Sequence, residues 1–347
     1  MAKQRVLILG ATGRTGGSIL NALLQDTDSF DLEALVRPAS AEKPAVKDLA
    51  AQGVKIHVVD ISGAKELVRV LMGVDVFISA IDAMGQAAQL QLVRVAKEAG
   101  VKRFVPCAFI TVAPPGGSHG SAGQCAFPIY LELFQTLIML DGAQKEEVYR
   151  EIWKHFVPYT IIDVGFWYQL SFPTLPSGHV DYAALVKPKV EIHAGGSAPT
   201  MLTDLRDIGA FVARIIKDPL TLNKCVAAYG DVLSENEIFA MMEEMADEKI
   251  ERKYARITAD EIDAKRLQAT ASARAAPNDP MAQLRGFIAD YENSKYVRGD
   301  NTPAYAKYLG YLDARELYPE FRPRTFRVFV AELLEGKGEM PSNSYGR

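Results

Sequence analysis

The sequence predicts an α/β fold built on a doubly wound parallel sheet, and two observations support this prediction. The first is a glycine-rich turn, in which an apolar run breaks at Gly10, Gly13 and Gly16 and then restarts with helical periodicity. The second is the alternation of short apolar runs with helical stretches over residues 1–165. Strands that are apolar throughout and separated by helices are typical of a parallel sheet covered on both faces.

Each expected element follows from its own local pattern. Apolar runs bounded by turn or charged residues predict that the first strand is followed by strands at 31–36, 54–59, 74–80, 103–107 and 159–164. Apolar residues at helical spacing predict helices near 15–25, 45–52, 63–72, 86–99 and 141–155. Right-handed crossovers would connect these strands into one sheet.

The domain organisation follows from where this alternation stops. A nucleotide-binding domain of the Rossmann type is expected over residues 1–165, with residues 203–230 returning to it. The pattern becomes irregular and aromatic-rich beyond it, and then mostly helical and charged. This change predicts a smaller, mostly helical C-terminal substrate region made of residues 166–202 and 231–347. The long break at 110–125, rich in glycine, is of the kind that often has a function.

Composition and charge favour a globular protein that acts on small molecules. Of 347 residues, 48% are apolar and 24% are charged, and the formal net charge is −4. Lysines and arginines are scattered, so neither a nucleic-acid stripe nor a membrane anchor is expected. No apolar run approaches the ~20 residues of a membrane span, and no signal-peptide core precedes the first strand. We therefore expect a cytoplasmic protein, monomeric or homodimeric.

Cysteine and histidine spacing gives no indication of a metal centre or a disulfide framework. Cys107, Cys125 and Cys225 are odd in number and widely separated, so we treat them as free thiols. The five histidines lack the spacing that would place two imidazoles on one face. The sequence also lacks a Gly-x-Ser-x-Gly elbow for acyl transfer.

The glycine-rich turn has the spacing of a dinucleotide-binding loop. Gly10 would allow a sharp turn, Gly13 would let backbone N–H groups approach a pyrophosphate, and Gly16 would let the helix pack closely against the strand. The phosphates would then lie at the positive end of the helix that begins near Thr15. Glycines also cluster in ordinary turns, so the neighbouring residues must decide between these interpretations.

Three cations near this loop favour NADP over NAD. Arg37 follows the second strand, where an acid would bind the ribose 2′-hydroxyl of NAD and an arginine accommodates the 2′-phosphate of NADP. Arg14 lies inside the loop, and Lys47 lies where the following helix should begin. The alternative is that Arg37 and Lys47 are ordinary surface charges. Asp60, after the third strand, could accept the adenine amino group or cap the next helix.

The Tyr-x-x-x-Lys pair of short-chain dehydrogenases, in which the lysine lowers the tyrosine pKa, occurs once in this chain. The match is Tyr291 with Lys295, in the C-terminal helical part, more than a hundred residues too late for that motif. We interpret it as a coincidence. The helix after the fifth strand instead contains Lys145.

These features together resemble one family. The chain is similar to the isoflavone reductase-like group of atypical short-chain dehydrogenases, which includes phenylcoumaran benzylic ether reductases, pinoresinol-lariciresinol reductases and NmrA-like proteins. The resemblance rests on the glycine loop, Arg37, residues 102–106, the Lys145 helix, residues 158–160 and Phe166. A fungal branch is the most similar, through residues 168–173, 230–237 and 298–303.

The resemblance implies an NADPH-dependent reductase with Lys145 as its general acid or base. Phe166 occupies the place of the phenylalanine that packs near the nicotinamide in these enzymes. The alternative from pattern alone is a solvated Lys145 that pairs with Asp141 or Tyr149 at helical spacing. The expected cofactor-binding residues are Gly10, Thr12, Gly13, Arg14, Thr15, Gly16, Arg37, Lys47, Asp60, Ala80, Phe109 and Phe166.

The substrate region departs from the plant reductases, so their substrates should not be transferred to this chain. The stretch 104–110 lacks the acid and the glycine found in those enzymes, and aromatic residues follow Phe166. Trp167, Tyr168 and Phe172 could stack on an aromatic ligand, or could pack between the two parts of the chain.

The functional hypothesis is an NADPH-dependent reductase of an aromatic or polyketide-like small molecule. A ketone, an enone, a benzylic ether or a quinone methide could be the reacting group. Two alternatives stay open: an NmrA-like protein that senses NADP(H) without catalysis, and an isomerase or cyclase with no net redox change.

Overall fold

The structure is a computed structural model that describes residues 3–81, 83–114, 142–184, 192–251, 258–277 and 279–338. Its described residues form two compact units. The first unit contains residues 3–81, 83–109, 144–163 and 205–226. The second unit contains residues 110–114, 142–143, 164–184, 192–204, 227–251, 258–277 and 279–338. The first domain was expected to run without interruption to residue 165, whereas residues 110–114 group with the second unit.

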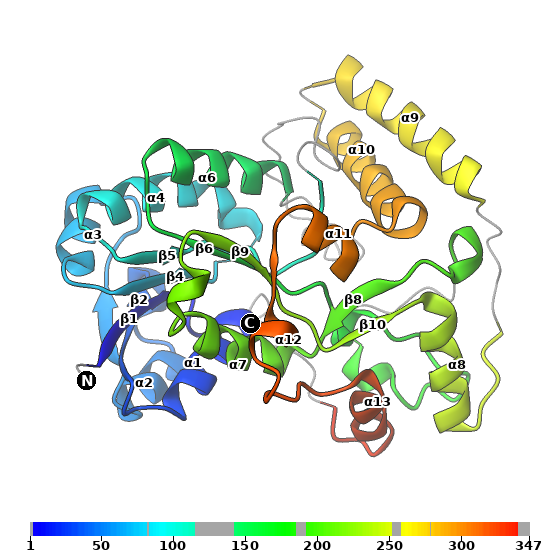
Figure 1. Cartoon of the computed structure of the whole chain (residues 1–347), viewed down its shortest axis with the longest axis horizontal. Helices are drawn as coiled ribbons and strands as arrows, with labels where there is room; N and C mark the ends of the chain where they lie inside the picture. The colour runs from blue at the N-terminus through cyan, green and yellow to red at the C-terminus, as the bar shows by residue number, and fades with distance from the viewer. Residues whose placement is uncertain are drawn as a thin grey trace. The chain divides into compact units, whose positions relative to one another are not determined.

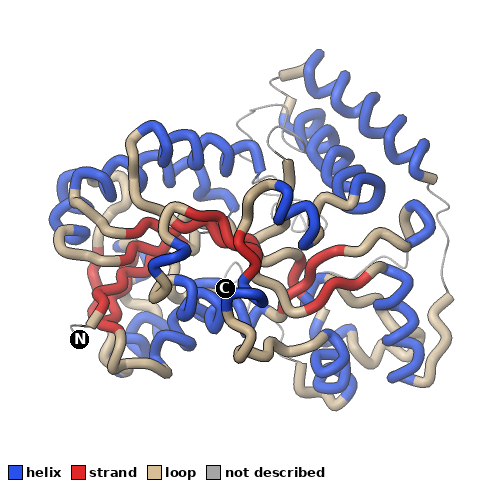
Figure 2. Tube along the Cα trace, viewed as in Figure 1, coloured by secondary structure: helices blue, strands red, loops and turns tan. Residues whose placement is uncertain are grey.

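A parallel sheet forms the centre of the first unit, as the sequence predicted (Figure 2). Its strand order is β3-β2-β1-β4-β5, and every neighbouring pair is parallel. The bounds are β1 (Gln4–Leu9), β2 (Phe30–Val36), β3 (Lys55–Val58), β4 (Val76–Ser79) and β5 (Arg103–Val105). A parallel bridge between Phe104 and Tyr159 continues the order to β6 (Thr160–Asp163), and β9 (Lys224–Ala227) lies beside β6. The order reverses at β1, which is the arrangement of dinucleotide-binding folds.

Helices cover both faces of this sheet (Figure 1). One face carries α1 (Arg14–Leu24), α2 (Pro44–Ala51) and α7 (Leu205–Ile215), and the other carries α3 (Ala64–Leu71), α4 (Gln89–Glu98) and α6 (Gly142–Lys154). Apolar side chains of the second group, such as Leu67, Leu92 and Val148, form one buried core with Phe77 and Phe104 of the sheet. Short 3₁₀ turns lie at η1 (Pro38–Ser40), η2 (Ala83–Ala88) and η6 (Pro219–Thr221).

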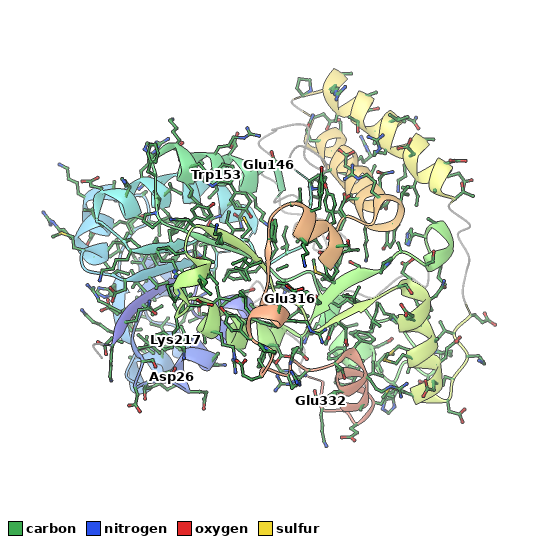
Figure 3. The ribbon with its side chains drawn as sticks, viewed as in Figure 1. Asp26, Glu146, Trp153, Lys217, Glu316 and Glu332 are labelled. Atoms are coloured by element: carbon green, nitrogen blue, oxygen red, sulfur yellow. The ribbon has the colours of Figure 1, made fainter. Side chains whose placement is uncertain are left out.

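Glycine and an ion pair bring α1 and α7 together. A Cβ on Gly209 would lie 1.9 Å from the Ser18 carbonyl oxygen, so the two helices touch backbone to backbone. Just beyond the two helices, Lys217 Nζ lies 2.7 Å from Asp26 Oδ2 (Figure 3). The α7 segment thereby joins the first unit although it lies far along the chain.

Several predicted elements have slightly different bounds in the structure, and two of these differences have a clear local form. The helix expected at 86–99 is divided into η2 and α4. The fifth strand ends at Val105 and not at Cys107, because the Cys107 amide donates to the Gln89 side chain at 2.7 Å. An amide that bonds a side chain cannot continue the strand ladder.

The second unit contains a small sheet and several helices. Its sheet has the order β10-β8-β7, with bounds Asp231–Leu233, Thr200–Thr203 and Phe166–Trp167. The remaining elements are α8 (Glu235–Ala246), α9 (Ala259–Ala275), α10 (Pro280–Asn293), a π-helical turn η7 (Ser294–Arg298), α11 (Pro303–Tyr308), β11 (Leu312–Asp313), α12 (Ala314–Leu317), α13 (Phe326–Leu334), and the 3₁₀ turns η3 (Tyr168–Leu170), η4 (Asp181–Ala183) and η5 (Ala194–Gly196). Within the described ranges, no helix has the length and apolar character needed to span a membrane.

Candidate functional site

The glycine loop joins β1 to α1 and has a geometry that requires glycine. Gly10 has a φ of +86°, and a Cβ there would lie 2.3 Å from the Ala80 carbonyl oxygen. A Cβ on Gly16 would lie 2.1 Å from the Gly10 carbonyl oxygen, so α1 begins in direct backbone contact with the loop. Neither approach is sterically possible with a side chain present. These contacts match the turn and packing roles that the spacing predicted for Gly10 and Gly16.

The start of α1 has no side-chain cap. Gly13 is the N-cap residue, has an extended backbone and provides no side chain to cap the first amides. Its own N–H donates to the Gly10 carbonyl oxygen at 2.9 Å, which fixes the loop. Helix N-terminal amides without a side-chain cap are available to a phosphate. Arg14 and Thr15 open the helix and Thr12 is exposed beside it, so the loop residues named from the sequence lie together.

The neighbouring strand end completes this edge of the sheet. The Ala80 amide, just after β4, donates to the Leu9 carbonyl oxygen at 2.8 Å. The carboxyl ends of β1 and β4 therefore meet where the strand order reverses. In doubly wound sheets this is the position at which ligands bind.

Two of the three cations expected to surround a 2′-phosphate, Arg37 and Lys47, differ in their surroundings. Arg37 follows β2 directly and is exposed. Lys47 lies inside α2, which begins at Pro44, and its Nζ is 3.0 Å from Glu42 Oε2. Lys47 therefore lies in the first turn of this helix, as expected, and its charge is paired with Glu42 on the surface.

Asp60 lies in the turn after β3 and is exposed. Its Oδ1 accepts the Ser62 amide at 2.9 Å, and hydrogen bonds from Ser62 lower the pKa of the Asp60 carboxyl. The N-cap residue of α3 is Gly63, so Asp60 stabilises the turn before the helix and does not cap the helix itself.

Lys145 is buried and paired with a carboxylate. The residue lies in the first turns of α6 and is only 5% exposed. Its Nζ is 3.3 Å from Oδ1 of Asp163, the last residue of β6, which is 2% exposed. The alternative of a solvated lysine was therefore wrong for this position, and Asp141, one partner proposed for it, lies outside the described residues. A buried ammonium needs such a partner, because an unpaired charge there is costly.

Asp163 is a candidate site residue that the sequence alone did not indicate. The only signal in the sequence was that this acid ends an otherwise apolar strand. The backbone of Phe109 anchors the same edge, because its amide donates to the Ile162 carbonyl oxygen at 2.8 Å. Phe109 is buried and has a φ of +44°, a strained conformation for a residue with a side chain. Lys145, Asp163 and Phe109 therefore gather at the carboxyl ends of β5 and β6.

Two of the three expected substrate-binding aromatics lie in the core of the second unit. Tyr168 is fully buried, and its hydroxyl donates to the Arg324 carbonyl oxygen at 2.9 Å. Phe172 is 2% exposed and its ring centroid is 5.8 Å from that of Phe329. These contacts occupy both rings, so the structure favours a packing role, within this unit, over ligand stacking. Trp167 remains partly exposed.

Phe166 has neighbours that the sequence analysis did not identify. Lys295 Nζ lies 3.9 Å from the centroid of the Phe166 ring, and the Tyr291 ring meets it edge-on at 5.6 Å. Burial lowers the pKa of the Lys295 amine and raises that of the Tyr291 hydroxyl. The sequence showed the spacing of this pair but not its contact with Phe166.

Within the described ranges, no group of three or more histidine, cysteine, aspartate or glutamate side chains could hold a metal ion. Cys107 and Cys225 form no disulfide bond, and Cys125 lies outside the described residues.

Known proteins align with nearly the whole chain. A model of the NmrA-like family matches residues 2–115. The asnovolin J 5′,6′-dehydrogenase of Aspergillus novofumigatus is 36% identical over 335 residues, which cover 95% of this chain and 95% of that protein. Probable pinoresinol-lariciresinol reductase 3 of Arabidopsis thaliana is 27% identical over 338 residues, covering 96% of this chain and 98% of that protein.

A solved structure shows the same fold. The leucoanthocyanidin reductase of Vitis vinifera, in its binary complex with NADPH, aligns with a TM-score of 0.70 at 21% identity, covering 95% of this chain and 99% of that one. The resemblance stated from the sequence is thereby confirmed. With its glycine loop, its reversing sheet and these relatives, the chain belongs to the NmrA-like family, within the isoflavone reductase-like group of oxidoreductases.

Proposed function

We propose that this chain is an NADPH-dependent reductase of an aromatic or polyketide-like small molecule, whose reacting group is a ketone, an enone, a benzylic ether or a quinone methide. The observation that supports it best is the buried pair of Lys145 and Asp163. This pair lies at the carboxyl edge of the sheet that also carries the glycine loop. A buried amine at a cofactor edge is suited to proton transfer.

The residues of the first unit fit a dinucleotide phosphate. The amides at the start of α1 would hold the pyrophosphate, with Thr12 and Thr15 beside them. Arg14 and Arg37 would pair with the 2′-phosphate. Ala80 and Phe109 would border the edge of the sheet at which the coenzyme rings bind. Bound NADPH would supply a hydride from nicotinamide C4.

Lys145 would handle the proton in this reaction. Its Nζ would give a proton to the substrate oxygen during reduction of a carbonyl, or take one from a phenol when a benzylic ether opens. Asp163 would orient the amine and offset its positive charge inside the protein. Lys145 is therefore the proposed catalytic residue, and Asp163 is a positioning residue.

Turnover with a substrate panel tests this proposal. The full chain would be incubated with NADPH and aromatic ketones, enones or benzylic ethers, and with NADP⁺ for the reverse direction, because one relative is named a dehydrogenase. We expect coenzyme consumption matched by a product that has gained two hydrogens. Product without coenzyme consumption would instead support an isomerase or cyclase. No turnover, together with a protein partner captured only when NADP(H) is bound, would support the sensor.

Coenzyme choice gives a prediction about Arg37. Replacing Arg37 with alanine is expected to weaken NADPH binding about tenfold, since a charge-assisted hydrogen bond contributes about 1.5 kcal/mol, and to leave NADH binding unchanged. Fluorescence titrations with NADPH and with NADH measure the two affinities and the ratio between them. Lys47→Ala is the matched control and should have a small effect, because Glu42 already pairs with Lys47. Equal losses for NADPH and NADH in Arg37→Ala would contradict the assignment.

A further inference from the structure

A lysine surrounded by aromatic rings lies in the second unit, away from the Lys145 pair in the sequence. We define the Lys295 cluster as Lys295, Phe166, Tyr291 and Tyr296. Lys295 Nζ is 3.9 Å from the Phe166 ring centroid and 4.8 Å from that of Tyr296. Lys295, Tyr291 and Tyr296 each keep part of their surface exposed.

The amine has no carboxylate partner in the described part of the chain. The acid that acts on it is Glu235, whose charge opposes the lowering of the Lys295 pKa by burial. Glu235 is engaged elsewhere, because its oxygens accept the His193 amide at 2.9 Å and lie 3.1 Å from His193 Nδ1. The His193 ring in turn stacks on Tyr296 at 4.0 Å. Contact with ring faces offsets only part of the cost of desolvating an ammonium.

The backbone holds the cluster in place. Lys295 belongs to the π-helical turn η7, a geometry that is rare and often found at functional sites. The turn is fixed by Asp300, whose carboxylate accepts hydrogen bonds from Ser294 Oγ at 2.6 Å and from Arg298 Nε at 2.9 Å. A hydrogen bond with Thr111 acts on the Tyr291 hydroxyl. The amine and the surrounding rings are therefore pre-positioned.

We propose that the Lys295 cluster is a binding site for a small aromatic or planar anion, a phenolate or an enolate, with Lys295 as the cation and the partly exposed Tyr291 and Tyr296 as its apolar neighbours. This site lies within the second unit and goes beyond the proposed function. An anionic oxygen would supply a partner for the amine. Flat aromatic side chains beside the amine suit an aromatic ring or a planar enol. The Tyr291 and Lys295 pair thus has a binding role at this position without being the short-chain dehydrogenase motif.

A matched pair of probes tests the inference by binding alone. The full chain would be titrated with 4-nitrophenol, above the pKa of that phenol, and with 4-nitroanisole, its methyl ether, and both affinities would be measured by isothermal titration calorimetry. We expect the wild-type chain to bind the phenolate about tenfold more tightly than the ether. Lys295→Met should remove this preference by weakening the phenolate only, and Lys295→Arg should retain it.

Controls separate this inference from folding and from the proposed function. Lys307→Met, at an exposed lysine paired with Glu316 at 3.6 Å, should behave as wild type. Circular dichroism and coenzyme titration would confirm that Lys295→Met is folded. Equal binding of phenolate and ether by the wild-type chain, no binding of either probe, or an unchanged preference in folded Lys295→Met would overturn the inference. A phenolate preference in a chain that never consumes NADPH would refute the reductase and leave the anion-binding site of the Lys295 cluster standing.

Discussion

Replacing Lys145 with methionine is expected to abolish turnover while leaving NADPH affinity unchanged. Methionine keeps the unbranched shape but cannot hold a proton, and loss of a general acid or base costs about 10²- to 10⁴-fold in rate. The coenzyme affinity should persist because the phosphate-binding residues lie on the glycine loop and after β2. Initial rates of NADPH oxidation and a coenzyme fluorescence titration measure the two effects separately.

Asp163, the buried carboxylate paired with Lys145, determines which control the Lys145→Met variant needs. Lys145→Met alone leaves Asp163 buried without its cation, which can cost about 3 kcal/mol of folding free energy. The double variant Lys145→Met with Asp163→Asn removes both charges and should recover most of that stability, while turnover stays lost. Lys154→Met changes an exposed lysine of the same helix and should retain full activity. Turnover close to wild type in a folded Lys145→Met variant would exclude the proposed proton transfer.

Gly16→Ala should have the largest effect on the coenzyme site. Its new Cβ would meet the Gly10 carbonyl oxygen at 2.1 Å, so α1 must move away from the loop. Such overpacking costs about 3 kcal/mol of folding free energy. Because the start of α1 is displaced, the affinity of the chain for NADPH should fall about 100-fold. Thermal unfolding and coenzyme titration are the measurements.

The adjacent glycine is a matched control in the same helix. A Cβ on Gly17 would lie 3.7 Å from the Ala11 carbonyl oxygen, an ordinary contact. Because alanine favours a helix interior over glycine, Gly17→Ala should stabilise the chain by up to about 1 kcal/mol and retain coenzyme binding. If Gly16→Ala and Gly17→Ala behaved alike, the close approach of α1 to the loop would not be what shapes the site.

The sheet and the loop could be predicted because local chemistry determines them. Apolar strands alternating with helices leave few architectures, and the contacts of Gly10 and Gly16 admit no side chain. The ends of elements were less predictable. The fifth strand stops early because a distant side chain, that of Gln89, takes the amide of Cys107.

The chemical environment of the site could be predicted only in part, because it depends on residues distant in sequence. Lys145 lies on a largely polar helix, and its burial depends on Asp163 in the next strand. Aromatic residues after Phe166 could equally have faced a ligand or a core, and only the contacts of Tyr168 distinguish the two. The pattern at Tyr291 and Lys295 was visible, but its neighbours come from elsewhere in the chain.

A crystal structure of the chain with NADP⁺ bound tests the central claim most directly. The account predicts the pyrophosphate at the N-terminus of α1, Arg37 against the 2′-phosphate, and Lys145 Nζ facing nicotinamide C4 across the substrate space. A nicotinamide ring remote from Lys145, with the amine directed away from C4, would contradict it.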